Sequence, residues 1–350
     1  MATTAVQATT TRTGSSGRTR DLRAFWRWTL AILAPLPLLA LAIEVLVVPW
    51  PVREGMASAI AGAAAHPGRA QTSLWLSMFF GLAVVPATMA VLWTARRGAP
   101  KLTLAAGLFL LLAFSASLPN TDLAAITAAR DGLDPALVVA IDDAVQTFPV
   151  VGVHALLFLL GQTVGFILLG FALWRARTVP AWVAAVIGVS GPLHLLVPGG
   201  NVGGAVSWAI TAIGYAGASV ALIRTRDEDF DLPPGTTTPT AAASPGPRTV
   251  WRWILALAAV PLAVFVAVFR YLMPYSDADS PREIFDKMVA ATTYQQIGLW
   301  VGAVVVLTGF AGILAVAWLT RRRTPVLTTI AMFLAVPGYI ALSRAGRTGT

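Results

Sequence analysis

Two stretches of this chain, residues 25–118 and 250–343, match at a constant offset of 225 positions without a gap. The matching positions are Trp26-Arg27-Trp28 with Trp251-Arg252-Trp253, Pro49 with Pro274, Gln71 with Gln296, Trp75 with Trp300, Trp93 with Trp318, Arg96-Arg97 with Arg321-Arg322, and Pro100 with Pro325. Self-similarity at a fixed spacing is typical of a duplicated structural unit. The match therefore predicts two copies of one fold and places their polar residues in pairs.

The chain is too apolar for a soluble domain. Of its 350 residues, 57% are hydrophobic and 12% are charged, whereas soluble domains carry about 25% charged residues. Apolar runs of about 20 residues can cross a hydrocarbon core of roughly 30 Å. The runs that meet this description are 28–49, 72–94, 102–118, 149–173, 181–197, 205–223, 253–272, 297–319 and 326–342. We therefore predict an all-α polytopic integral membrane protein with about nine transmembrane helices.

The order of the runs predicts the domain organisation. Six runs precede the second copy, and because six is an even number the two copies share one orientation as a parallel internal repeat. The second copy is incomplete, since it ends after three spans. The predicted parts are a disordered basic tail (1–24), a six-span unit (25–223), a disordered linker (224–249), a three-span partial repeat (250–343) and a short tail (344–350).

Charge predicts the orientation of these spans. Basic residues gather on alternate loops, at Arg12, Arg18, Arg20, Arg23, Arg27, Arg96, Arg97, Lys101, Arg175, Arg177, Arg224, Arg226, Arg248, Arg252, Arg321, Arg322 and Arg323. By the positive-inside rule these loops face the cytoplasm. We therefore predict a multi-pass protein of the cell membrane with a cytoplasmic N-terminus and a C-terminus outside. The same distribution accounts for the net charge of +9 without a nucleic-acid partner.

Two charged residues lie inside predicted spans. Glu44 is near the outer end of the first run and Arg270 near the outer end of the seventh. The offset aligns Glu44 with Phe269, so the two charges lie at similar depth. Polar groups at membrane depth cost free energy and are functional candidates. We predict either a Glu44–Arg270 ion pair between the copies or two side chains that reach the headgroups separately.

His154 and His194 lie in the outer parts of the fourth and fifth runs. Two histidines at similar depth on adjacent helices are a candidate site for haem or a metal ion, or for a proton or quinone. The alternative is that both imidazoles are hydrogen-bonded where helices pack. No second ligand lies one turn away from either residue.

Gln71 and Gln296 occupy equivalent positions at the outer starts of two spans, where they either line a shared vestibule or solvate the helix ends. The chain contains no cysteine, which excludes thiolate nucleophiles and cysteine-ligated clusters. The glycine-rich link 199–204 does not follow a strand, as a phosphate-binding loop would, and it predicts a tight hairpin. No catalytic motif is present, so an enzymatic activity is not indicated.

The stretches GFILLGFALWR and SGPLHLLVPGGN within residues 149–223 resemble uncharacterised multi-pass membrane proteins of high-GC, actinobacterial-type bacteria. These proteins have no established activity, so the resemblance assigns no catalytic residue or cofactor.

Three functions fit these observations. The first is binding or moving a small solute through a polar pocket in the outer leaflet. The second is a structural or accessory membrane subunit, whose partial second repeat docks a membrane-protein partner or a second copy of the chain. The third is a haem or metal redox protein that uses the two histidines. All three require the lipid bilayer as a partner.

Overall fold

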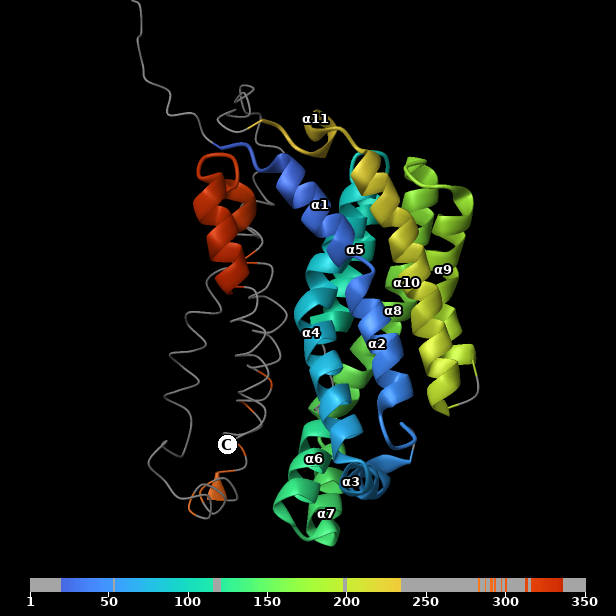
Figure 1. The fold of residues 1–350 in the computed structure, drawn as a ribbon, viewed down its shortest axis with the longest axis vertical. Helices are drawn as coiled ribbons and strands as arrows, with labels where there is room; N and C mark the ends of the chain where they lie inside the picture. The colour runs from blue at the N-terminus through green and yellow to red at the C-terminus, as the bar shows by residue number, and fades with distance from the viewer. Residues whose placement is uncertain are drawn as a thin grey trace, which may run out of the picture.

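The computed structural model describes residues 20–52, 54–115, 121–197, 200–233 and 316–335, together with isolated positions between 283 and 313. Within these residues every regular element is a helix and no strand occurs, which confirms the predicted all-α class for this part of the chain (Figure 1). The seventh apolar run and most of the eighth, and with them most of the predicted second copy, lie outside the described residues.

The helices follow the predicted runs closely. In chain order they are α1 (Arg23–Leu33), α2 (Leu36–Val47), α3 (Gly55–Ala65), α4 (Pro67–Ala95), α5 (Pro100–Ser115), α6 (Thr121–Asp131), α7 (Pro135–Gln146), α8 (Pro149–Ala176), α9 (Ala181–Leu196), α10 (Gly200–Arg224) and α11 (Asp227–Phe230). A further helix covers Pro325–Ala335. Proline begins α4, α5, α7 and α8, as expected of a residue whose missing N–H is not needed in the first turn.

Four helical segments among the described residues are long and apolar enough to cross a membrane: Arg23–Val47, α4, α8 and α10. They contain 25 to 29 residues, which at 1.5 Å per residue exceeds a core of roughly 30 Å. The helices α5 and α9 contain 16 residues each and run beside the long ones (Figure 1). Four such segments indicate a membrane protein, and the predicted nine spans remain a prediction.

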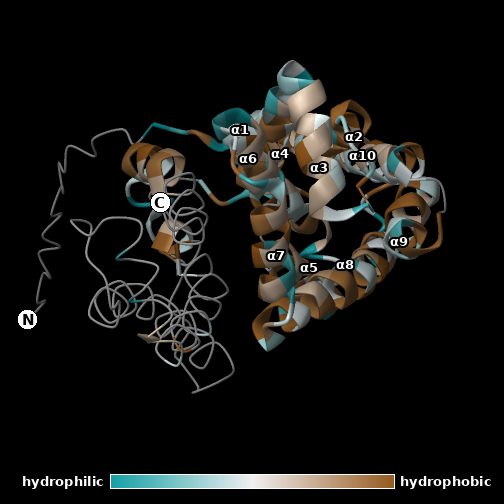
Figure 2. Cartoon of the chain, turned by 90° about the horizontal axis from the view of Figure 1, so that it is seen from below, coloured by the Kyte–Doolittle hydropathy of each residue, from teal (hydrophilic) through white to brown (hydrophobic). Residues whose placement is uncertain are grey.

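The first run is divided near its middle. Pro35 and Pro37 lack the N–H groups that a continuous helix would use, and α1 ends at Leu33 while α2 begins at Leu36. The helices of the bundle consist mostly of hydrophobic residues (Figure 2), and many of their apolar side chains are exposed, such as those of Leu156, Leu160 and Ile213. A bundle that is apolar outside as well as inside is suited to lipid rather than to water.

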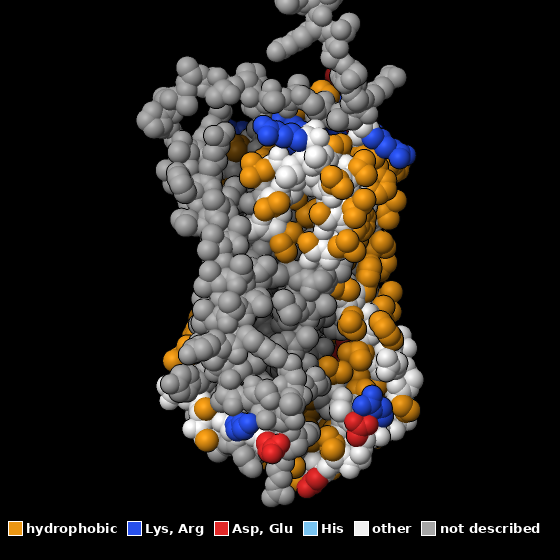
Figure 3. Space-filling view, turned by 90° about the vertical axis from the view of Figure 1, so that its left-hand side faces the viewer, with side chains coloured by type: hydrophobic (Ala, Val, Ile, Leu, Met, Phe, Trp, Pro, Cys, Tyr) orange, Lys and Arg blue, Asp and Glu red, His pale blue; other side chains and the backbone are white. Residues whose placement is uncertain are grey.

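The two ends of the bundle differ in charge. At one end lie the start of α1, the α4–α5 and α8–α9 turns, α11 and residues 321–323, and we call this the basic end. At the other end α3, α6 and α7 lie across the bundle (Figure 1), and we call this the acidic end. Figure 3 shows basic side chains at one end, acidic side chains together with some basic ones at the other, and mostly apolar side chains between them among the described residues.

The helices at the acidic end form a small core of their own. The helices α3 and α7 lie in the stretches between the first and second and between the third and fourth apolar runs. Asp134 caps α7 by accepting a hydrogen bond of 3.0 Å from the Ala136 N–H. The helix α6 was not predicted, and it packs its buried Ala125 and Ala128 against the buried part of α3.

Glycine sets how closely α8 approaches its neighbours. A Cβ atom at Gly170 would lie 2.6 Å from the Ala184 carbonyl oxygen and from the backbone of Gly188 on α9. On the α5 side, a Cβ at Gly161 would lie 2.7 Å from the Phe109 carbonyl oxygen. Small residues at such contacts are typical of helix packing in membranes.

The described part of the predicted repeat shows local equivalence. Residues 91–100 and 316–325 have the same succession of helix, turn and helix, position by position. In both, an arginine lies over the tryptophan three residues earlier: Arg96 over Trp93 at 3.8 Å and Arg321 over Trp318 at 3.5 Å. In both, the arginine also donates to that tryptophan's carbonyl. Equivalence of the full copies remains a prediction.

A short segment, residues 227–231, joins these two turns, and we call it the strap. It lies within the predicted linker, yet Phe230 is only 5% exposed and its carbonyl accepts hydrogen bonds from Trp93 and Arg96. Asp231 then forms ion pairs with Arg321 at 2.7 Å and Arg322 at 3.1 Å. The rings of Trp93 and Trp318 meet edge to face at 5.1 Å beside it.

Candidate functional site

Glu44 is the only charged residue of α2, whose sequence is LPLLALAIEVLV. It lies in the last turn of the helix, near the acidic end, and is 7% exposed. Its carboxylate makes no hydrogen bond or ion pair with any residue that the structure describes. A buried carboxylate without a partner is costly, because burial removes its hydration. Arg270, its predicted partner, lies outside the described residues, so the ion pair stays a prediction.

A second carboxyl group approaches Glu44 from the acidic end. Asp122 lies in the first turn of α6 and is half-buried, and its charge acts on Glu44. Burial raises the pKa of Asp122 above its ordinary value of 3.8. Two carboxyl groups held close together repel each other when both are ionised. The pair therefore favours a proton or a positively charged group between or beside its members.

Five aromatic rings form a closed cycle of contacts in the middle of the bundle and towards its acidic end. They are Phe80 of α4, Phe114 of α5, Phe166 of α8, His194 of α9 and Trp208 of α10. The ring centroids of His194 and Trp208 are 3.9 Å apart. In the other four pairs of neighbouring rings the centroids are 6.0 to 6.4 Å apart. Each of five helices thus contributes one ring, and the cycle ties them together at one level.

Hydroxyl groups accompany this aromatic ring cycle. The Thr211 hydroxyl lies 3.2 Å from Nε2 of His194 and donates to the Ser207 carbonyl at 3.0 Å. On the basic side of the cycle Tyr215 is fully buried, contacts Phe166 at 6.3 Å and shares a hydrogen bond of 3.3 Å with Thr88. Through these contacts His194 of α9 packs against α10. This environment agrees with the alternative in which the imidazole is hydrogen-bonded where helices pack.

An amide without a partner lies one helical turn from this cycle. Gln162 of α8 precedes Phe166 by four residues and is 4% exposed, and its Oε1 accepts no hydrogen bond from any described residue. A buried carbonyl oxygen of this kind loses its hydration without replacement. Gln162 was not singled out from the sequence, because a lone glutamine in an apolar helix carries no spacing signal.

The other predicted histidine has a different environment. Nδ1 of His154 lies 2.6 Å from the carbonyl oxygen of Val150, one turn earlier on α8, and the side chain is half-buried. The two imidazoles therefore have separate partners, Val150 and Thr211. Within the residues that the structure describes, no group of three or more metal-ligating His, Asp or Glu side chains is found.

Gln71 lies in the second turn of α4 at the acidic end and is exposed. This position favours the interpretation that it solvates the helix end. Gln296 lies outside the described residues, so a shared vestibule remains a prediction. Nearby, Asn201 of the predicted hairpin donates to the Trp50 carbonyl at 2.9 Å and accepts from the Val52 N–H at 3.0 Å.

Compared with family models, curated proteins and solved structures, the chain shows no match. The resemblance drawn from residues 149–223 therefore remains a prediction.

Proposed function

We propose that this chain is a multi-pass protein of the cell membrane that binds, and moves, a small lipophilic cation through a polar pocket near its acidic end. The observation that carries the proposal is the buried carboxylate of Glu44, which has no partner among the described residues. A positively charged solute offsets the free-energy cost of that burial.

One further observation supports a cation, and another supports a lipophilic one. Asp122 adds a second carboxyl group within electrostatic range of Glu44. The aromatic ring cycle in the same half of the bundle supplies π faces, which attract cations. Apolar walls with a few polar groups are typical of small-molecule sites.

The proposed topology completes this account. We place six passes in residues 25–223, with α5 and α9 as the two short ones, and we place the basic end in the cytoplasm. The pocket then lies near the outer surface, where α3, α6 and α7 cover the bundle.

Equilibrium binding to the purified full chain tests the proposal, with tetraphenylphosphonium as the probe and tetraphenylborate as an anion of the same size. We expect saturable binding of the cation alone. Replacing Glu44→Gln is expected to lower its affinity at least about tenfold, the effect of losing one buried charge pair. Gln71→Ala, at an exposed position of the same end, serves as the matched control.

Arg270→Ala separates this function from the predicted ion pair. If Glu44 serves the solute, Arg270→Ala leaves tetraphenylphosphonium binding intact or strengthens it. If Glu44 serves only to pair with Arg270, both single variants lose thermal stability, and the charge swap Glu44→Arg with Arg270→Glu restores it. Equal binding of the cation and the anion would contradict the proposed function.

A further inference from the structure

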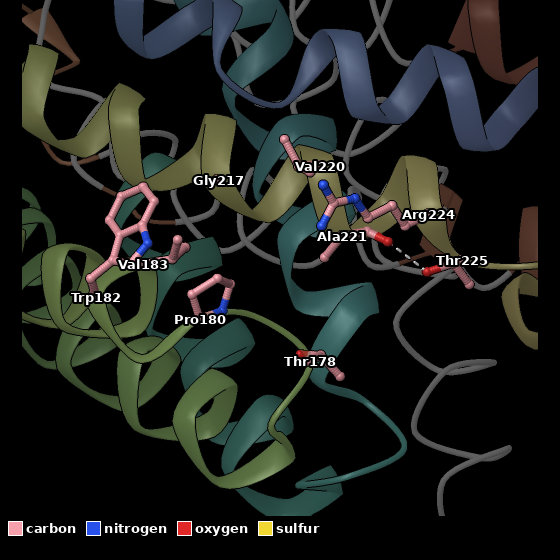
Figure 4. A pocket seen from close by; sticks show the side chains of 9 residues that line it. All are labelled: Thr178, Pro180, Trp182, Val183, Gly217, Val220, Ala221, Arg224 and Thr225. Atoms are coloured by element: carbon pink, nitrogen blue, oxygen red, sulfur yellow. Dashed lines mark hydrogen bonds between the residues drawn. The ribbon is translucent and has the colours of Figure 1, made fainter.

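A groove lies between the start of α9 and the end of α10, at the basic end. It has a volume of about 390 Å³. The lining residues, drawn in Figure 4, are Thr178, Pro180, Trp182, Val183, Gly217, Val220, Ala221, Arg224 and Thr225. None of the predicted site residues lines this groove, and it is separate from the Glu44 region at the opposite end.

The polar part of the groove is positive. Arg224 is its one charged lining residue, and no carboxylate lines it. Figure 4 shows the Arg224 guanidinium reaching back along α10 over Val220 and Ala221. It makes no hydrogen bond or ion pair with any residue that the structure describes. Thr178 lines the groove from the α8–α9 turn, and the hydroxyl of Thr225 donates to the Ala221 carbonyl at 2.8 Å.

The rest of the groove is apolar and narrow at its base. Val183 and Val220 line it from the two helices, and the base is where α9 and α10 touch. A Cβ atom at Gly217 would lie 2.5 Å from Cγ2 of Val183. Val220 is 44% exposed, so the apolar wall opens outward rather than into the bundle.

The groove also lies at headgroup depth. Arg224 ends the apolar helix α10, and Arg175 and Arg177 lie just before Thr178 on the α8–α9 turn. Trp182 is 55% exposed at the first turn of α9, as tryptophans at membrane interfaces are. Basic pockets between helices at this depth attract anionic lipid headgroups.

We propose that this groove binds an anionic phospholipid, with the phosphate at Arg224 and one acyl chain along Val183, Gly217 and Val220. A free phosphate ion would meet one cation and no enclosing donors, whereas a lipid adds contact along the whole apolar wall. The site would hold a bound lipid against the α9–α10 pair.

Native mass spectrometry of the full chain in detergent tests the site, with phosphatidylglycerol, phosphatidylcholine of the same acyl chains, and inorganic phosphate as probes. We expect phosphatidylglycerol to be retained in preference to phosphatidylcholine. Arg224→Ala is expected to lower that retention about fivefold, the effect of one interfacial charge. Arg226→Ala is the matched control, because its side chain is 80% exposed and lies 3.9 Å from Glu228.

A second variant tests the apolar part of the groove. Val220→Trp, at an exposed position, would fill the groove and lower retention of phosphatidylglycerol without removing any charge. Equal retention of the two lipids, or unchanged retention in both Arg224→Ala and Val220→Trp, would overturn the proposal. Displacement of phosphatidylglycerol by inorganic phosphate at comparable concentration would also overturn it and would leave an anion site without a lipid.

Discussion

Gly170 and Gly152 lie on the same helix but differ in what surrounds them. A Cβ atom at Gly170 would overlap the α9 backbone at 2.6 Å, whereas one at Gly152 would meet nothing within 4 Å. Backbone atoms cannot yield as a flexible side chain can, so a methyl group at Gly170 must separate α8 from α9.

We therefore predict that Gly170→Ala lowers the free energy of unfolding by about 1 to 3 kcal/mol, as overpacking does. Gly152→Ala is predicted to be neutral or stabilising, because alanine is the better helix former. Thermal melts of the two variants in one detergent provide the comparison. Equal melting temperatures would show that α8 and α9 are not packed as closely as described.

Asp122 supports a prediction about pH. Burial raises its pKa above 3.8, so its contribution to stability is fully present below pH 3.8 and is lost as pH rises through the raised pKa. Asp122→Asn should then increase the melting temperature at pH 7 and give no gain near pH 3.5. In the proposed site the same variant should weaken cation binding. A loss of stability at pH 7 would indicate that Asp122 is held by favourable contacts instead.

At the scale of elements, the strap connects two turns that are equivalent in sequence. Burial on its own would raise the pKa of Asp231. This effect is outweighed by the hydrogen bond and charge of Arg321, and by the hydrogen bonds from the Leu232 N–H and from Arg322. The pKa of Asp231 therefore lies below its ordinary value. Burial also lowers the pKa of Arg96 to about 10, so this guanidinium stays charged at neutral pH.

We predict that Asp231→Asn loosens the strap at neutral pH, by about 1 to 3 kcal/mol as for hydrogen bonds to charged groups. Because the chain has no cysteine, spin labels at Glu228→Cys and Arg323→Cys report the distance directly. The distribution of distances between the two labels should broaden in Asp231→Asn. It should not broaden in Asp229→Asn, because the Asp229 side chain is 61% exposed. The pKa of Asp231 is depressed, so the parent protein should show the same broadening only below pH 3.8. A broad distribution in the parent protein at pH 7 would contradict the docked strap.

Local signals predicted the helices well. Proline marks the starts of α4, α5, α7 and α8, and Asp134-Pro135 encodes both the cap and the first turn of α7. The helix α6 was missed because its sequence TDLAAITAARD carries no regular apolar pattern. The strap was missed because the composition of residues 224–249 indicates disorder, while its order depends on contacts with Arg96 and Arg321.

The candidate site was predicted only in part. Glu44 stood out because a charge inside an apolar run is visible in the sequence alone. The aromatic ring cycle could not be predicted, because its members come one each from five helices and share no spacing. One of these members, Trp208, lies 3.9 Å from His194 on the next helix, a contact that no spacing along the chain indicates.

At the scale of the whole molecule, both proposals depend on the difference in charge between the two ends of the bundle. The Glu44 region lies near the acidic end and the lipid groove at the basic end, so each proposal requires these ends to lie on opposite sides of a membrane. The apolar outer surface and the four long helices support this arrangement.

Cysteine labelling in intact cells tests this arrangement most directly, since the natural chain has no cysteine to react. Asp143→Cys on α7 and Lys101→Cys on α5 place single exposed thiols at the acidic and basic ends. We predict that a membrane-impermeant maleimide labels the first in intact cells and the second only after the membrane is permeabilised. Labelling of both thiols in intact cells, or of Lys101→Cys alone, would contradict the account.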